Sequence, residues 1–180
     1  MGGWVAALAS FTLLVMWWRR YLDVYDLITE SHFHDLGKLC FAFTAFWGYL
    51  TFGQYLVIWY GNLPEETGFV FARLYGPWLP VGRAVLLGLF VIPFIGLLDV
   101  APKKAPATLG LFAVISLVAL WLERYLLVMP SVSHEGAPHL GVPELGPTLL
   151  MAGLFLLAYA LFARTFPMLS PRLAEITLGR

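Results

Sequence analysis

The chain has 180 residues, of which 60% are hydrophobic and only 12% charged, with zero net charge at pH 7 and a mean hydropathy of +0.79. Soluble domains carry about 25% charged residues, so this composition excludes an ordinary soluble domain and favours a surface that faces lipid. The zero net charge gives no basis for nucleic-acid binding, and the single Cys40 excludes an intrachain disulfide, a c-type haem site and a Cys-ligated iron–sulfur cluster.

Five apolar stretches are long enough, or nearly so, to cross a hydrocarbon core, which takes roughly 17–25 helical residues. Lipid admits only helices and closed barrels, and none of the five alternates polar with apolar residues, so they predict an all-α membrane bundle. We expect one transmembrane domain over residues 1–180, with four bundled helices and one peripheral helix. The predicted helices lie near 4–18, 39–60, 81–98, 108–129 and 148–166.

The first predicted helix, 4–18, is short and starts abruptly after a few residues. It lacks the basic flank and the cleavage site of a secretory signal. Such a start is typical of an internal helix, so we expect the chain to correspond to half of a larger protein, split or truncated.

The most polar stretch, 19–38, leads into the second helix and ends in a cluster of His32, His34, Asp35 and Lys38. Histidine titrates near neutral pH and a neighbouring carboxylate can pass protons on, so the cluster is a candidate proton relay. Helix capping and interfacial anchoring explain it equally well. A metal site made by the two histidines and the aspartate is a weaker hypothesis, because helical residues one or two apart point in different directions.

The second helix carries a polar face made of Thr44, Thr51, Gln54 and Tyr55. A face of this kind can line a hydrated path or a quinone pocket. Hydrogen bonding to a neighbouring helix is the alternative, and we favour it on general grounds.

The segment after the second helix begins with Glu65 and Glu66 just beyond the predicted span. These carboxylates are candidates for a proton exit or for docking a basic partner, although exposed loop carboxylates are common. Downstream, 69–75 predicts a short interfacial helix and Trp78 an aromatic anchor at the membrane surface.

Three further features concern the connections and the third helix. Pro93 predicts a kink within 81–98. The segment 99–107 predicts a tight turn with basic anchors, and 130–147, which is rich in proline and glycine, predicts an irregular loop.

Glu123 and Arg124 are the charged pair inside the fourth predicted helix, near its outer edge. Charges at that depth are costly unless they are paired or hydrated, so a function or an obligatory pair between helices is expected. Adjacent helical residues do not face one another, and each is therefore predicted to have a separate partner.

Basic residues are divided unevenly between the two sides of a five-helix bundle. One side has Arg73, Arg83 and Arg124. The other has Arg19, Arg20, Lys38, Lys103, Lys104, Arg164, Arg172 and Arg180. The positive-inside rule then predicts a multi-pass protein of the cytoplasmic (inner) membrane, with the N-terminus outside and the C-terminus in the cytoplasm.

The middle of each predicted span contains no histidine and no carboxylate. A b-type haem ligated by histidines within the spans is therefore not expected, nor is a complete carboxylate proton wire. If the chain conducts protons, it is predicted to do so through half-channels at the two faces.

Two runs of residues carry a family resemblance. They are HFHDLGKLCFAFTAFWGYLTFGQYLVIWYGNLPEE at 32–66 and WLERYLLVMPS at 121–131. The first run contains His-Asp-Leu-Gly-Lys at 34–38, Gly-Gln at 53–54 and Asn-Leu-Pro-Glu-Glu at 62–66. In these motifs the chain resembles the NrfD-like membrane subunit of alternative complex III, of the ActF type.

The resemblance implies a subunit of a quinol oxidoreductase in a respiratory or photosynthetic electron-transport chain, with cytochrome c or a high-potential iron–sulfur protein as electron acceptor. The implied partners are a second NrfD-like subunit, a multihaem cytochrome c and an iron–sulfur protein, besides lipid and quinol. Haem c and iron–sulfur clusters belong to those partners. This chain is expected to have no catalytic residue, metal or redox cofactor of its own, and to act as an accessory subunit.

Full members of the family are roughly twice as long, and the chain corresponds to their C-terminal half. The helix that opens that half starts outside the cell, which agrees with the orientation given by the basic residues. Two alternatives stay open: a structural membrane anchor without chemistry, and half of an NrfD-like quinol-binding subunit of a polysulfide-reductase-type complex.

Overall fold

The computed structural model describes residues 1–132, 137–139 and 141–166, and its regular secondary structure in those ranges is entirely helical. The chain divides into two units, Met1–Pro138 and His139–Arg180, which we treat separately. The all-α class predicted from the sequence is confirmed.

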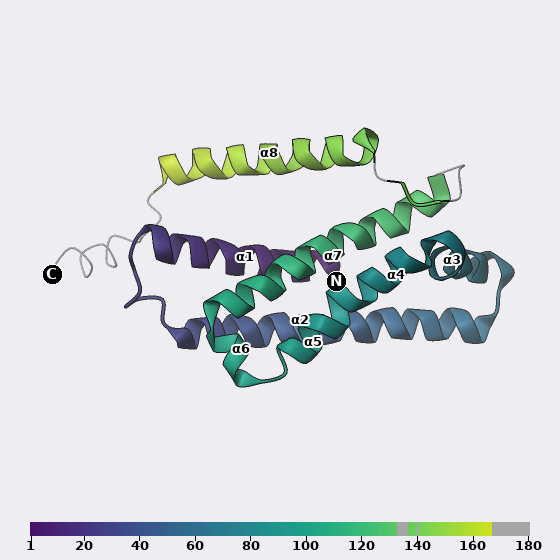
Figure 1. The fold of residues 1–180 in the computed structure, drawn as a ribbon, viewed down its shortest axis with the longest axis horizontal. Coiled ribbons are helices and arrows are strands. Elements are labelled where there is room, and N and C mark those ends of the chain that lie inside the picture. Colours follow the sequence, from purple (N-terminus) through teal and green to yellow (C-terminus); the bar gives the residue numbers. More distant parts are fainter. Residues whose placement is uncertain (133–136, 140, 167–180) are drawn as a thin grey trace. The chain divides into compact units, whose positions relative to one another are not determined.

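The elements follow one another in the order seen in Figure 1. Unit 1 contains α1 (Gly2–Tyr21), α2 (Glu30–Gly61), α3 (Pro64–Leu74), the 3-10 turn η1 (Gly76–Trp78), α4 (Leu79–Leu86), the π-helical turn η2 (Leu87–Val91), α5 (Ile92–Gly96), α6 (Val100–Lys104) and α7 (Pro106–Val132). Unit 2 contains α8 (Val142–Thr165).

Four helical stretches of the described residues are long and apolar enough to cross a membrane. They are Glu30–Gly61, Gly76–Gly96, Pro106–Val132 and Val142–Thr165. The remaining predicted span, α1, has 20 residues with Arg19 and Arg20 in its last turn, and it is not among the four. The fold is thus a helical bundle of the membrane type, with four clear spans where the sequence predicted about five.

Three polar segments are more helical than the sequence-based prediction. α2 begins at Glu30 instead of near residue 39, behind Thr29, whose backbone N–H donates to Nδ1 of His32 at 3.2 Å. α3 starts at Pro64, a favoured first helical residue, rather than near residue 69. The predicted tight turn at 99–107 contains the short helix α6, capped by Asp99, whose Oδ1 accepts from the N–H of Val100 at 2.7 Å.

The predicted irregular loop at 130–147 is also shorter than expected in its described part. α7 continues to Val132, and α8 begins at Val142, where Pro143 occupies the first turn. The backbone N–H of Gly141 donates to Oε2 of Glu144 at 2.8 Å, which closes a cap at the start of α8. Residues 133–136 and 140 of this segment lie outside the described residues.

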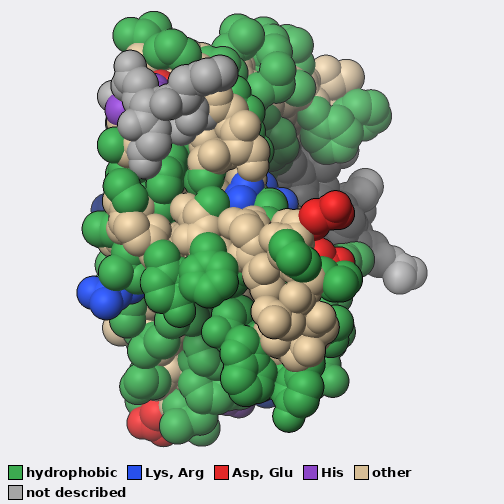
Figure 2. All heavy atoms as spheres, turned by 90° about the vertical axis from the view of Figure 1, so that its right-hand side faces the viewer, with side chains coloured by type: hydrophobic (Ala, Val, Ile, Leu, Met, Phe, Trp, Pro, Cys, Tyr) green, Lys and Arg blue, Asp and Glu red, His purple; other side chains and the backbone are tan. Residues whose placement is uncertain are grey.

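Large apolar side chains cover much of the surface. On the second half of α2, Tyr49 and Val57 are each 70% exposed, and α8 has no buried residue. Figure 2 shows a face dominated by hydrophobic side chains, with few charged groups between them. Such a surface is unfavourable in water and suits a hydrocarbon environment.

The third span departs from regular α-helical geometry where Pro93 predicts it. Proline lacks the N–H that would bond to the carbonyl four residues earlier. The turn before Pro93, Leu87–Val91, is π-helical. Its hydrogen bonds span five residues instead of four.

Small residues let this span approach α7 closely, as is common between membrane helices. A Cβ added at Gly88 would lie 2.9 Å from Cβ of Ala119, an atom fixed to the backbone of α7. We expect Gly88→Ala to lower the free energy of unfolding by about 1–2 kcal/mol, because the two helices must separate. The measurement is unfolding of the purified protein by SDS titration in mixed micelles.

The matched control is Gly53→Ala on α2, where an added Cβ meets nothing within 4 Å. This variant is expected to be neutral or slightly more stable, since alanine favours helix. Equal losses of stability in the two variants would contradict a close contact at Gly88.

Candidate functional site

A carboxylate lies inside the bundle of unit 1. The indole N–H of Trp47, on α2, donates to Oε1 of Glu123, on α7, at 2.9 Å. The other carboxylate oxygen, Oε2, accepts from Nη2 of Arg124 at 2.9 Å. The Glu123 side chain is 13% exposed and Trp47 is 5% exposed, whereas the Arg124 side chain is 60% exposed. A mostly buried carboxylate is thus held between a buried donor and a cation at the surface.

This pairing corrects the expectation that Glu123 and Arg124 have separate partners. Adjacent Cβ atoms do point in different directions on a helix. The arginine side chain is long enough to turn back, and the carboxylate has a second oxygen free for it, so the salt bridge forms within α7. The interhelical partner of the pair is the neutral Trp47.

The carboxylate is nearer the end of α7, but its partner Trp47 lies near the middle of α2. Trp47 is about 25 Å along α2 from Glu30 and about 21 Å from Gly61, at 1.5 Å per residue. Glu123 therefore lies beside the mid-length of the longest helix.

The first turn of α1 meets the same site. A Cβ added at Gly2 would lie 2.6 Å from Nη2 of Arg124 and 3.3 Å from Oε2 of Glu123, so only glycine fits there without displacement. In Figure 1 the start of α1 accordingly lies beside the middle of α2. The start of α1 therefore closes the site on the side of Arg124 and Glu123.

A second set of predicted residues lines an open groove between α2 and α3. The groove has a volume of about 970 Å³, and its polar lining includes Gln54, Glu65 and Glu66, while Leu50, Val57 and Phe69 contribute apolar walls. The structure therefore brings Gln54 together with both glutamates.

The position of the two glutamates has a local structural cause. Asn62 adopts a left-handed conformation (φ 46°) and ends α2, and Pro64 opens α3 at the next favourable position. Glu65 and Glu66 then occupy the first turn of α3, where acidic side chains stabilise a helix. The Asn-Leu-Pro-Glu-Glu motif thus ends one helix and begins the next, and it is also a candidate for function.

The polar face predicted on α2 is divided in two. Thr44 is buried (2% exposed) between helices, whereas Thr51, Gln54 and Tyr55 are exposed. Their spacing does place them on one side of the helix, but α1 covers only the half that contains Thr44. The quinone-pocket and hydrated-path hypotheses for the four residues as one face are therefore not supported.

The residues predicted as a relay lie within the first turns of α2. Oδ1 of Asp35 pairs with Nζ of Lys38 at 2.7 Å, one helical turn away, and both side chains are more than half exposed. Nδ1 of His34 is buried and has no hydrogen-bond partner in the described part of the chain. The structure thus joins Asp35 to Lys38 and leaves His34 outside that pair.

Basic side chains from other elements gather at this end of unit 1. The Arg19 guanidinium lies 5.2 Å from the ring centroid of Phe33, and Nζ of Lys103 lies 5.2 Å from that of Phe41. We call this the basic end. The metal hypothesis finds no support, because within the described ranges no group of three or more His, Cys, Asp or Glu side chains is placed to hold an ion.

Arg73 lies in the predicted interfacial helix 69–75, but its burial and its partners were not predicted from the sequence. It is 5% exposed, and its guanidinium donates to the carbonyls of Phe69 (3.0 Å) and Leu127 (2.8 Å) and to Oγ of Ser131 (2.6 Å). Burial lowers the pKa of Arg73 from its ordinary value. A cation at the last turn of α7 is favoured by the helix dipole.

Comparison with protein-family models and with curated protein sequences finds no match to this chain. The resemblance to NrfD-like subunits accordingly depends on the motif residues at 32–66 and 121–131. The buried carboxylate and its surroundings are therefore the main structural indication of function.

Proposed function

We propose that the chain is a membrane subunit of a quinol oxidoreductase complex of the alternative complex III type, in which Glu123 accepts and releases a proton. The observation that carries the proposal is the buried carboxylate held by Trp47 and Arg124 at the mid-length of α2. An ionisable group inside a membrane bundle is costly, and it is typical of proton paths and of substrate or ion sites.

The surroundings of Glu123 support a group that changes its protonation state. An indole N–H can donate to either a charged or a neutral carboxyl group, so the bond from Trp47 holds the side chain in both states. Arg124 is more exposed and can turn to solvent or lipid headgroups when the carboxylate is neutralised.

In this proposal the remaining candidates serve the two ends of unit 1. Asp35, Lys38 and His34 lie near the basic end, and the groove with Gln54, Glu65 and Glu66 lies beyond Glu123 along α2. The complex belongs to the cytoplasmic membrane, with the basic end on the cytoplasmic side. Its haem and iron–sulfur centres reside in partner subunits, with quinol as the electron donor.

The competing function is a structural anchor in which the bond from Trp47 to Glu123 only ties α2 to α7. Glu123→Gln separates the two, because the amide oxygen still accepts from the indole but the side chain no longer exchanges a proton. We expect the purified complex to keep its subunits, while the number of protons released per quinol beyond the two that quinol oxidation itself yields falls at least about tenfold.

Two variants serve as controls for that measurement. Glu123→Asp keeps an ionisable group and should retain part of the proton release. Glu30→Gln removes an exposed carboxylate from the first turn of α2 and should leave the ratio of protons to quinol unchanged. Wild-type proton release from the Glu123→Gln complex would reject the proton role and support the structural anchor.

A further inference from the structure

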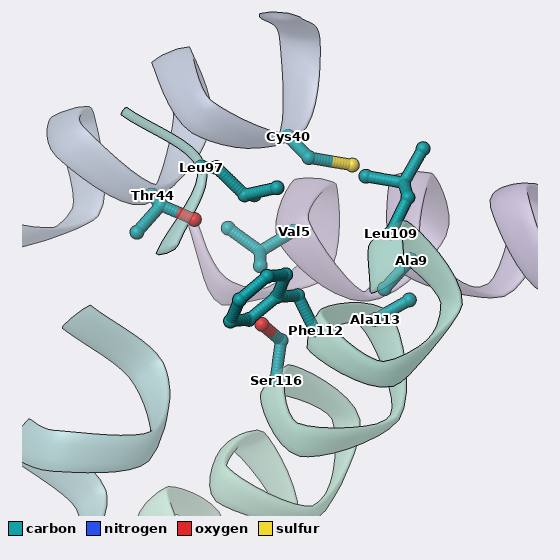
Figure 3. Close-up of a pocket in the computed structure, with 9 residues that line it drawn as sticks. All are labelled: Val5, Ala9, Cys40, Thr44, Leu97, Leu109, Phe112, Ala113 and Ser116. Atoms are coloured by element: carbon teal, nitrogen blue, oxygen red, sulfur yellow. The ribbon is translucent and has the colours of Figure 1, made fainter. Parts of the chain in front are cut away.

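A small internal cavity lies between α1, α2 and α7, about one helical turn from Trp47. Its volume is about 10 Å³, roughly the room that one water molecule requires. Apolar side chains line most of it, including Leu109 and Phe112. Figure 3 shows that the polar atoms come from α2 and α7: the hydroxyls of Thr44 and Ser116 and the thiol of Cys40.

The two hydroxyls are the unusual part of this lining. Thr44 is 2% exposed and Ser116 is 5% exposed. Among the described residues neither one takes part in an interhelical hydrogen bond, unlike Cys40, Trp47, Arg73 and Thr108. Empty cavities in proteins are apolar, whereas polar cavities large enough for a water generally contain one.

We infer that this cavity binds one water molecule, hydrogen-bonded by the hydroxyls of Thr44 and Ser116. The water gives each hydroxyl a hydrogen-bond partner in the gap between α2 and α7, where no direct bond joins the two side chains. The cavity is thus suited to a small neutral molecule that both donates and accepts hydrogen bonds.

The position of the site gives it a role in the proposed proton path. Cys40, Thr44 and Trp47 recur at helical spacing on one side of α2, and Ser116 precedes Glu123 by two turns, about 10 Å, on α7. The water therefore lies between the basic end and Glu123. This role depends on the proposed function, whereas the binding of the water does not.

Radiolytic hydroxyl-radical labelling of the purified membrane complex tests the site, because radicals formed from an internal water label the side chains beside it. Leu109 (1% exposed) lines the cavity, and Leu89 (0% exposed) is equally buried but does not. We expect labelling of Leu109 to exceed that of Leu89 by about fivefold or more. Equal labelling of the two leucines would overturn the inference.

The double variant Thr44→Val, Ser116→Ala tests whether the two hydroxyls hold the water. Labelling of Leu109 is expected to fall to the level of Leu89, and persistence of the label would overturn the assignment to these residues. The matched control is Thr51→Val, on the exposed part of the same face of α2, which should change nothing. If the double variant does not assemble, the comparison of the two leucines in the wild-type complex still shows whether the cavity contains water.

The labelling result is independent of proton release. A labelled Leu109 together with an unaffected Glu123→Gln complex would keep the water and reject the proposed function. An unlabelled Leu109 together with a defective Glu123→Gln complex would reject the water and keep the proposed function.

Discussion

Arg73→Ala is expected to lower the free energy of unfolding of unit 1 by about 3 kcal/mol. The arginine is 5% exposed and its guanidinium joins α3 to the end of α7 through Leu127 and Ser131. Hydrogen bonds from charged donors contribute about 1.5–3 kcal/mol each, and the truncation also leaves a cavity. Unfolding by SDS titration in mixed micelles measures the loss.

Two variants show whether the hydrogen-bond geometry or the charge is responsible. Arg73→Lys keeps the charge but loses the fork of N–H donors that reaches the carbonyl and the hydroxyl together, so it should recover less than half of the loss. Arg83→Ala removes an exposed arginine from the neighbouring α4 and is expected to change stability by less than about 0.5 kcal/mol. Similar losses for Arg73→Ala and Arg83→Ala would contradict the buried link.

Trp47→Ala is expected to be the most destabilising of these substitutions, at about 3–5 kcal/mol. The side chain is 5% exposed in the larger apolar cluster, together with Trp78, Leu89 and Leu120. Its removal opens a large cavity and leaves the Oε1 atom of Glu123 without its donor. The same SDS titration measures the effect.

Trp47→Phe isolates the contribution of the indole N–H, because most of the ring volume is kept. We expect a loss of about 1–3 kcal/mol from the stranded carboxylate oxygen. Trp59→Phe is the control on the same helix, since Trp59 is 61% exposed and should tolerate the change. A Trp47→Phe variant as stable as Trp59→Phe would show that the bond to Glu123 is not important for folding.

The candidate site illustrates how far sequence reasoning reached. Glu123 stood out because a charge within an apolar run requires a partner. The identity of that partner was not predictable: Trp47 is 76 residues away, and nothing in an aromatic-rich helix distinguishes the one indole that faces α7. The burial of Arg73 was not predictable either, since an arginine in a polar segment is normally exposed.

The sequence by itself determined the class of this protein: apolar runs without alternation leave helices as the solution in lipid, and caps such as Thr29 and Asn62 limit them. Only the tertiary structure decided which polar groups meet and how deeply they lie. Helical periodicity gives each residue a side, but the neighbour on that side depends on how far each helix extends and how closely it packs. Thr44 and Tyr55 share a face of α2, yet α1 covers only the first of them.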